Sequence, residues 1–331
     1  MKYENDFLLK LYKDLLETRL LEIKMTDLYA ESRVPGHIHS GTGQEAAFVG
    51  VLATRKPGDY FKLPHRVVSS AYLVGDPLDT FFGEILAKKT GNSGGRGGIN
   101  HLGRLCDGVL GMSGTLGCDA AIPVGAAMTI EAEGRDNVAF FFVGDGATNR
   151  GPVYEAMTLA ADWKLPVVFV CINNGFAIST PITYASPVPN VMADKAAGFN
   201  MPAVIVDGTD VLDTYEGASK IVEGVRAGNG PAVIECKCCR WRGHFEGDQC
   251  AYRDQSVTEK WMQERDCVKN FEQDLVKQGI LTDEQIGKMR QDFDREMEEA
   301  IARAEAHTSA PSSKKALPSP GNIPKRTNAW H

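Results

Sequence analysis

Short apolar runs alternate with helical segments through the middle of the chain, and this alternation limits the fold more than any other feature. The run 138–143 reads VAFFFV and is apolar throughout, which is typical of a strand buried on both faces of a sheet. The predicted strands are 138–143, 167–172, 204–206 and 232–236, and the helices between them include 152–163 and 211–226. This order predicts an α/β fold, with a mainly parallel sheet and helices on both of its faces.

A polar side chain follows each of the first two strands. Asp145 sits in a Gly-Asp-Gly turn after 138–143, and Asn174 comes 29 positions later, after 167–172. If helix 152–163 joins the strands as neighbours, both side chains emerge at one sheet edge, where α/β sheets bind ligands. Carboxylate, amide and carbonyl oxygens suit Mg²⁺, which takes its remaining ligands from water and phosphates. The pattern predicts a site for Mg²⁺ and a phosphorylated cofactor; the alternative is an ordinary turn after a strand.

The composition argues against several kinds of partner and location. The formal net charge of -7 speaks against nucleic acid, because phosphate backbones are held by surplus lysine and arginine. No apolar run approaches the roughly 18 residues that a membrane-spanning helix needs, so we expect no membrane association. The first residues carry acids and lack an uninterrupted apolar segment, unlike a signal or transit peptide. We therefore expect a cytoplasmic protein.

The other segments predict a single domain over residues 1–306, followed by a loose tail over 307–331. Apolar spacing predicts helices over 5–32, from Gln44 onward, over 75–90 and over 120–132. Six glycines in 91–103 argue against regular structure there. Residues 257–306 are charged and helical in pattern, with a capping box at Thr282 and Gln285.

Eight cysteines are too few and too scattered for a disulfide scaffold in a chain of 331 residues. Cys236, Cys238 and Cys239 lie near His244 and Cys250, a combination that invites comparison with zinc sites. The paired Cys-x2-Cys spacing of structural zinc sites is missing, however. The run VIECKCC also fits a strand in which cysteine acts as a small apolar residue, and we favour that interpretation.

Several motifs together resemble one known family. Beside the Gly-Asp-Gly turn and the Asn-Asn pair, the sequence contains GHIHSGTGQEA (36–46), GGRGGINH (94–101), GTLG (114–117) and RWRGHFEGDQCAYRD (240–254). In this combination they are similar to the α subunit of the E1 component of 2-oxo acid dehydrogenase complexes, including acetoin dehydrogenases. The resemblance covers about residues 7–300. It implies the thiamine-diphosphate-binding fold.

The resemblance also implies roles for individual residues. Asp145 and Asn174 would bind Mg²⁺ together with the backbone carbonyl of Phe176, and all three would contribute to the cofactor site. The other expected contacts to thiamine diphosphate are His65, Arg66, Gly114, Leu116, Gly144, Gly146, Ala147 and His244. In this assignment Arg66 pairs with the diphosphate, and Leu116 wedges the cofactor into a bent shape. The glycines after the first strand would let the backbone approach the phosphate.

Two histidines are the predicted catalytic residues. His244 matches a loop histidine beside the diphosphate and the reacting centre, and His39 matches a histidine near the 2-oxo substrate. Both suit proton transfer near neutral pH. Each has a simpler alternative, because His39 could cap the helix that begins near Gln44 and His244 could be merely exposed. The neighbouring Arg240 and Arg242 favour an anionic ligand beside His244.

The resemblance implies an oxidoreductase that cleaves acetoin or decarboxylates a 2-oxo acid such as pyruvate, with carbanion chemistry supplied by the cofactor. The activating glutamate of the family lies on a separate β chain. The implied assembly is therefore an α2β2 heterotetramer with the E1 β subunit, which passes its acyl group to a lipoyl-bearing E2. The GHFEGD run favours the acetoin branch over pyruvate.

Three alternatives remain. A branched-chain 2-oxo acid dehydrogenase fits because, as in those members, no histidine follows shortly after Arg66. A stand-alone thiamine-diphosphate lyase or decarboxylase would need its activating glutamate in this chain, and Glu45 and Glu84 are the candidates. A non-catalytic scaffold would keep the fold without the cofactor, but the presence of both Asp145 and Asn174 argues against it.

Overall fold

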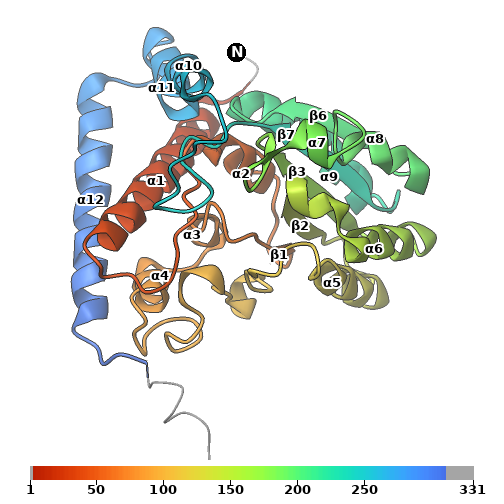
Figure 1. The fold of residues 1–331 in the computed structure, drawn as a ribbon, viewed down its shortest axis with the longest axis horizontal. Helices are drawn as coiled ribbons and strands as arrows, with labels where there is room; N and C mark the ends of the chain where they lie inside the picture. The colour runs from red at the N-terminus through yellow and green to blue at the C-terminus, as the bar shows by residue number, and fades with distance from the viewer. Residues whose placement is uncertain (1–2, 311–331) are drawn as a thin grey trace, which may run out of the picture.

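The computed structural model describes residues 3–310 and has a five-stranded parallel sheet at its centre (Figure 1). The strands are β1 (Tyr60–Lys62), β2 (Ala139–Gly144), β3 (Val167–Asn173), β6 (Ala203–Asp207) and β7 (Ala232–Lys237). Their order across the sheet is β1-β2-β3-β7-β6, and each neighbouring pair is parallel. The predicted α/β fold with a mainly parallel sheet is confirmed.

Helices cover both faces of this sheet. They are α1 (Asn5–Ala30), α2 (Glu45–Leu52), α3 (Ser70–Val74), α4 (Leu78–Ile85), α5 (Ala121–Ala132), α6 (Gly151–Asp162), α7 (Ile182–Ala185), α8 (Ala193–Ala196), α9 (Val211–Arg226), α10 (Gln255–Glu264), α11 (Cys267–Lys277) and α12 (Asp283–Glu305). Phe140 and Phe142 of β2 lie in one core with α2 and α9, whereas Phe141 lies in a second core with α5 and α6. Because successive side chains of a strand face opposite sides, a strand covered on both faces must be apolar throughout.

The crossover from β2 through α6 to β3 fixes where the polar strand ends meet. The two strands are neighbours, as the sequence predicts, and Gly144 at the end of β2 is in register with Ile172 of β3. Asp145 and Asn174 each follow immediately after their strand. Both residues therefore leave the sheet at the same edge.

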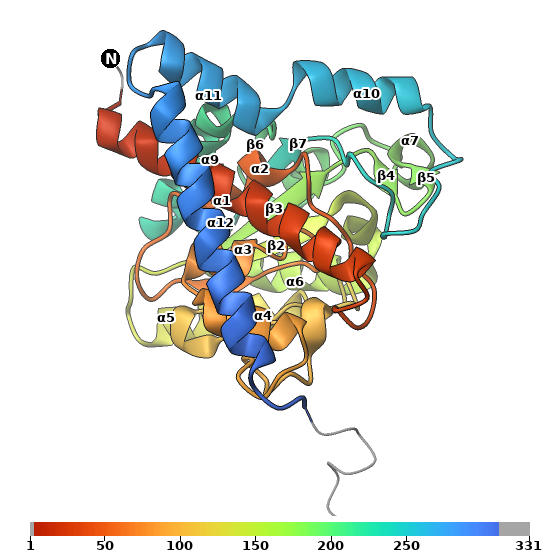
Figure 2. The same ribbon diagram turned by 90° about the vertical axis from the view of Figure 1, so that its left-hand side faces the viewer.

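An outer layer of helices lies against the first core. Helix α12 packs on α1 and α4 and crosses in front of α1 in Figure 2, while α10 and α11 run along the top of that view. It buries Phe293 and Met297, and it begins at the predicted capping box, where Thr282 and Gln285 bond to each other's backbone amides. The helical prediction for 257–306 is confirmed.

The structure differs from the sequence analysis in two places, one strand that was not predicted and one helix whose bounds are wrong. The sequence does not predict β1, because three residues that include a lysine give no apolar run. The segment 75–90 is not one helix: α4 covers only its middle. Gly75, at φ 137°, separates α3 from α4, and Ala87, at φ 53°, follows the end of α4. Neither backbone conformation continues an α-helix.

Other segments follow the expected outline with small additions. Residues 91–103 contain only a short 3-10 turn at Gly98–Asn100. A hairpin of β4 (Phe176–Ala177) and β5 (Thr180–Pro181) follows β3 and was not predicted. Of the predicted loose tail, 311–331 lies outside the described residues. No helix within the described part of the chain is long and apolar enough to cross a membrane.

The cysteines are free thiols, and several of them belong to the core. Cys236 lies in β7 and, like Cys238, is buried, which raises the pKa of both thiols. Within residues 3–310, no group of three or more His, Cys, Asp or Glu side chains is arranged to hold a metal ion. In this part of the sheet, cysteine occupies the place of a small apolar residue.

Candidate active site

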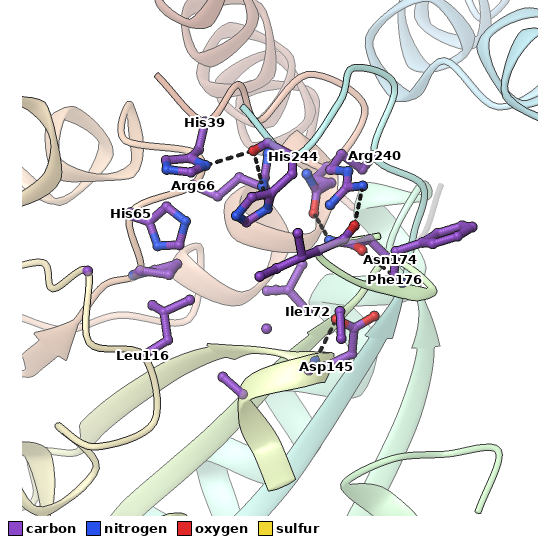
Figure 3. A pocket seen from close by; sticks show the side chains of 18 of the residues that line it. His39, His65, Arg66, Leu116, Asp145, Ile172, Asn174, Phe176, Arg240 and His244 are labelled. Carbon is purple, nitrogen blue, oxygen red and sulfur yellow. Dashed lines mark hydrogen bonds between the residues drawn. The ribbon is translucent and has the colours of Figure 1, made fainter. Parts of the chain in front are cut away.

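A cavity of about 400 Å³ opens at the carboxyl ends of β2 and β3 (Figure 3). Every site residue that the sequence predicts lines it, namely His39, His65, Arg66, Gly114, Leu116, Gly144, Asp145, Gly146, Ala147, Asn174, Phe176 and His244. These residues come from several segments that are far apart in the chain. The fold therefore brings the predicted site together in one place.

Asp145 lies at the sheet side of this cavity, directly after β2 (Figure 3). The residue is 2% exposed, and burial raises the pKa of its carboxyl group to about 6. Its Oδ1 accepts a hydrogen bond from the amide of Gly146 and its Oδ2 one from the amide of Gly175, both at 2.8 Å. Both partners are neutral amides, so a bound cation would offset the cost of burying this charge.

Asn174 is oriented by two neighbours. Its Nδ2 donates to Oε1 of Gln44 at 3.3 Å, and its Oδ1 accepts from the amide of Phe176 at 3.2 Å. Gln44 is fully buried, and its Nε2 has no hydrogen-bond partner among the described residues. Asn174 and Phe176, which opens the β4–β5 hairpin, therefore lie together beside Asp145 and form the predicted oxygen-rich corner of the cavity.

Two buried arginines face the same cavity. Arg66 donates to the carbonyl oxygens of Ser40 and His244, each at 2.8 Å. Arg240 donates to the carbonyl of Ile178 at 2.9 Å and to the hydroxyl of Tyr252 at 2.7 Å. Neither guanidinium forms an ion pair with a carboxylate within the part of the chain that the structure describes. Burial, and then Arg240, lower the pKa of Arg66 to about 9, which leaves it charged at neutral pH.

Three histidines gather on the side of the cavity away from Asp145 (Figure 3). The ring centre of His39 lies 4.2 Å from that of His65 and 4.8 Å from that of His244. Burial, with a contribution from the nearby Arg66, lowers the pKa of His39 and His244 to about 4. Burial also lowers the pKa of His65, to about 2. All three rings are therefore neutral at pH 7 in the ligand-free chain.

The hydrogen bonds fix the tautomers of two of these rings. Nδ1 of His39 lies 2.7 Å from the carbonyl oxygen of His244, and a carbonyl can only accept, so this nitrogen carries the proton. Nδ1 of His244 lies 3.4 Å from a guanidinium nitrogen of Arg66, which can only donate. The neutral His39 thus has a free acceptor at Nε2, and the neutral His244 a free donor at Nε2.

Gly144 and Gly146, at the end of β2, differ in how much room a side chain would have. A side chain at Gly144 would meet no atom within 4 Å, so this position stays open to the cavity. At Gly146 a Cβ atom would lie 2.5 Å from Cβ of Ala177. Gly146 is thus required by packing against the β4–β5 hairpin, a reason that the sequence does not reveal because the hairpin is not predicted.

The cavity wall also contains residues outside the predicted set, among them Gln44, Phe48, Arg150, Ile178 and Arg240. Gln44 and Arg240 lie inside the motifs at 36–46 and 240–254. Their position as polar residues in these motifs could have indicated that they line the site. Ile178 belongs to the unpredicted hairpin region, and Phe48 is on an otherwise ordinary buried helix. For these apolar residues no sequence signal exists.

Comparison with known proteins identifies the family. A family model described as "Dehydrogenase E1 component" matches residues 13–313. The chain belongs to this family. It is 40% identical over 268 residues to the α subunit of acetoin:2,6-dichlorophenolindophenol oxidoreductase of Bacillus subtilis, a match that covers 81% of this chain and 80% of the relative. The corresponding subunit of Cupriavidus necator is 36% identical over 304 residues, with 92% and 91% covered.

A second group of relatives carries another name. The pyruvate dehydrogenase E1 component subunit alpha of Zymomonas mobilis is 33% identical over 307 residues, which cover 91% of this chain and 85% of the relative. Dehydrogenase E1 components are oxidoreductases, and the family implies thiamine diphosphate as the cofactor. The resemblance inferred from the sequence motifs is confirmed.

The residues of the cavity fit this cofactor. Arg66 and Arg240 offer buried positive charge without a carboxylate partner, which suits a diphosphate. Asp145 and Asn174 offer oxygen atoms for a cation beside it. Apolar wall residues such as Leu116 suit the rings of the cofactor.

Proposed function

We propose that this chain is the α subunit of a thiamine-diphosphate-dependent E1 dehydrogenase that acts on acetoin or on a 2-oxo acid such as pyruvate. It would work in an α2β2 heterotetramer with an E1 β subunit and pass its acyl group to a lipoyl-bearing E2. The observation that carries the proposal is the pair of buried arginines, Arg66 and Arg240, in one cavity with the buried carboxylate of Asp145. In such a site the two arginines match the negative charge of a diphosphate, and the carboxylate matches the positive charge of the cation bound to it.

Asp145, Asn174 and the carbonyl of Phe176 are the proposed ligands of Mg²⁺. The support is their joint position at the ends of neighbouring strands and the raised pKa of the Asp145 carboxyl, which a cation would lower. Mg²⁺ prefers such oxygen ligands and takes others from phosphate and water. The other cavity residues would hold the diphosphate and the rings, with His65 and Arg66 on one side and Gly146 and Ala147 on the other.

His39 and His244 are the proposed proton-transfer residues. Thiamine diphosphate supplies, when bound, a carbon nucleophile and a sink for the electron pair released by bond cleavage. The free Nε2 of His39 can accept a proton from a substrate hydroxyl, and Nε2–H of His244 can donate one to a developing oxyanion. Arg66 holds His244 in this role, because it donates to the backbone carbonyl of His244 and lies beside its ring. The same carbonyl accepts from Nδ1 of His39.

The proposed need for a β subunit is supported by the acids of this chain. Asp145 is the single carboxylate among the described residues that line the cavity. Glu45 is fully buried in an ion pair with Arg19, and Glu84 is held by amides of the glycine-rich loop. Neither glutamate lines the cavity, so a stand-alone enzyme would lack its activating acid.

Acetoin is the preferred substrate in this proposal, because relatives of that name share 40% and 36% identity with the chain, against 33% for a pyruvate dehydrogenase subunit. Pyruvate and branched 2-oxo acids remain the alternatives. A cytoplasmic location also remains a prediction.

The test is to produce the chain with and without a β subunit encoded beside it. Turnover of acetoin, pyruvate and a branched 2-oxo acid is measured with 2,6-dichlorophenolindophenol as the electron acceptor. We expect turnover only with the β subunit, and only when thiamine diphosphate and Mg²⁺ are present. Turnover by the chain alone would contradict the proposed heterotetramer and support a stand-alone enzyme. If calorimetry showed that the complex does not bind thiamine diphosphate, the result would favour the alternative of a non-catalytic scaffold that keeps the fold without the cofactor.

A further inference from the structure

A lysine is buried at the end of β1, next to the cavity but outside its wall. Lys62 is 2% exposed, although lysine is among the residues least often buried. Its Nζ donates to the carbonyl oxygen of Gly111 at 2.8 Å and lies 2.7 Å from Oδ2 of Asp119. Burial lowers the pKa of this amine, and the bond to Asp119 opposes that shift. A buried ammonium group is costly unless it is paired, so both contacts are needed for the fold to tolerate it.

The two partners of Lys62 are the two ends of one loop. The loop runs from Gly111 to Asp119, just before α5, and its middle carries Gly114 and Leu116, which line the cavity (Figure 3). No helix or strand holds this middle part. Lys62 therefore ties both ends of an irregular loop to the regular sheet.

The loop also has contacts of its own with neighbouring segments. Nε of Arg150 donates to the carbonyl oxygen of Leu116 at 3.5 Å, and the amide of Met112 donates to the carbonyl oxygen of Leu102 at 2.6 Å. On the β1 side, an isolated bridge joins Ser113 to Pro64. On the β2 side, a Cβ atom at Gly117 would lie 2.7 Å from the carbonyl oxygen of Ala147. The loop thus passes in close contact with the turn after Asp145, and Lys62 acts together with these contacts at the two ends of the loop.

We propose that Lys62 is a positioning residue that holds the loop over 111–119 so that Leu116 and Gly114 meet the rings of the bound cofactor. The inference rests on the proposed function, since it concerns the same cofactor site. Lys62 does not line the cavity and acts through the loop. The diphosphate end of the site is built around Asp145 and around Arg66, which follows Lys62 by four residues in the chain. Neither of these side chains bonds to Lys62 within the described residues, because the contacts of Lys62 go to the loop instead.

This separation gives a test based on binding. The full chain, in complex with its β subunit, is titrated in calorimetry with thiamine diphosphate and with inorganic diphosphate, each in the presence of Mg²⁺. For Lys62→Met, we expect the dissociation constant of thiamine diphosphate to rise roughly tenfold or more, while that of inorganic diphosphate changes less than about twofold. A merely structural defect would weaken both ligands together.

A double variant and a matched control complete the test. Lys62→Met/Asp119→Leu removes both charges, so it leaves no partly buried carboxylate unpaired and keeps the test possible if the single variant fails to fold. It should bind thiamine diphosphate as weakly as Lys62→Met. The control is Lys10→Met, on the exposed face of α1, which should change neither constant.

Three results decide the question. Wild-type affinity for thiamine diphosphate in Lys62→Met, or its recovery in the double variant, would overturn the role of Lys62. An equal loss for both ligands would overturn it too. A wild-type complex that binds inorganic diphosphate but not thiamine diphosphate would overturn the proposed function instead.

Discussion

The buried carboxylate of Glu22 binds Ser69 at two atoms. Its Oε1 accepts from the hydroxyl of Ser69 at 2.8 Å and from the amide of Ser69 at 3.2 Å. Its Oε2 accepts from the amide of Gly41 at 2.8 Å. One side chain of α1 thus joins the segment that carries His39 to the segment that carries Arg66.

This link predicts that Glu22→Gln weakens the site as well as the fold. A glutamine has only one oxygen, so its amide group would face a backbone N–H donor and leave that donor unsatisfied. We expect the free energy of unfolding to fall by about 1–3 kcal/mol, as for an unsatisfied buried group. We also expect Mg²⁺-dependent binding of inorganic diphosphate to weaken, because Arg66 loses its support. Urea denaturation and calorimetry measure the two effects.

Glu17→Gln is the matched control for this prediction. Glu17 lies on the same helix, is also buried, and accepts a hydrogen bond from the hydroxyl of Tyr72 at 3.0 Å. Its loss should cost stability without changing the affinity for diphosphate. If both variants lowered the affinity equally, Glu22 would have no special link to the site.

The neutral histidines predict that the ligand-free chain loses stability in mild acid. Burial lowers the pKa of His65 from the ordinary histidine value of about 6.5 to about 2. Above about pH 6.5 the histidine is neutral in both the folded and the unfolded chain. Below that pH the unfolded chain binds a proton that the folded chain does not, so the free energy of unfolding falls as the pH falls. From about pH 7 to about pH 5 the loss from one such histidine is ~2 kcal/mol.

His65→Gln should remove that part of the pH dependence. Urea denaturation of wild type and variant at about pH 7 and about pH 5 gives the difference, in which the contributions of groups distant from His65 cancel. The control is His307→Gln, at an exposed position just beyond α12. A wild-type stability that falls by the same amount as that of His65→Gln would contradict the assignment of His65 as a buried neutral ring.

The strands that could be predicted from the sequence are those whose burial produces a run of apolar residues. β2 and β3 are covered on both faces, so the runs 138–143 and 167–172 are apolar throughout and stand out in the sequence. β1 contains Lys62, whose charge is satisfied by Asp119 from a distant segment, and a single sequence does not show that pairing. Gly75 and Ala87 bound α4 through backbone conformations that follow from tertiary packing rather than from local preference.

The site was predictable to the extent that motifs mark it. Asp145 and Asn174 could be placed from strand ends alone, and the histidines and Arg66 from the family resemblance. The supporting residues Glu22 and Lys62 escaped notice, because each looks like an ordinary charged residue of a helix or a strand. Their function depends on which loops pack against them, and that information lies in the three-dimensional contacts.

Asp145→Ala should abolish Mg²⁺-dependent binding of thiamine diphosphate and leave the fold intact. The substitution removes the proposed metal ligand, so we expect affinity to fall by at least about 100-fold. The amides of Gly146 and Gly175 also lose their acceptor, so we expect the free energy of unfolding to fall by about 1–3 kcal/mol while the chain stays folded. Asp207→Ala is the control, because Asp207 also stands at a strand end but pairs with Arg265 outside the cavity. Calorimetry with retained affinity in Asp145→Ala would count decisively against the metal site.

The substitution His39→Asn distinguishes the role of Nδ1 of His39 from the role of Nε2. The amide of asparagine can still donate to the carbonyl oxygen of His244, as Nδ1 does at 2.7 Å, but it offers no base at the position of Nε2. We expect kcat to fall by about 10²–10⁴-fold, the usual range for loss of a general base, while the affinity for thiamine diphosphate stays close to wild type. His37→Asn, at an exposed neighbouring position outside the cavity, should leave kcat unchanged. Wild-type kcat in His39→Asn would show that His39 serves only to hold the loop of His244.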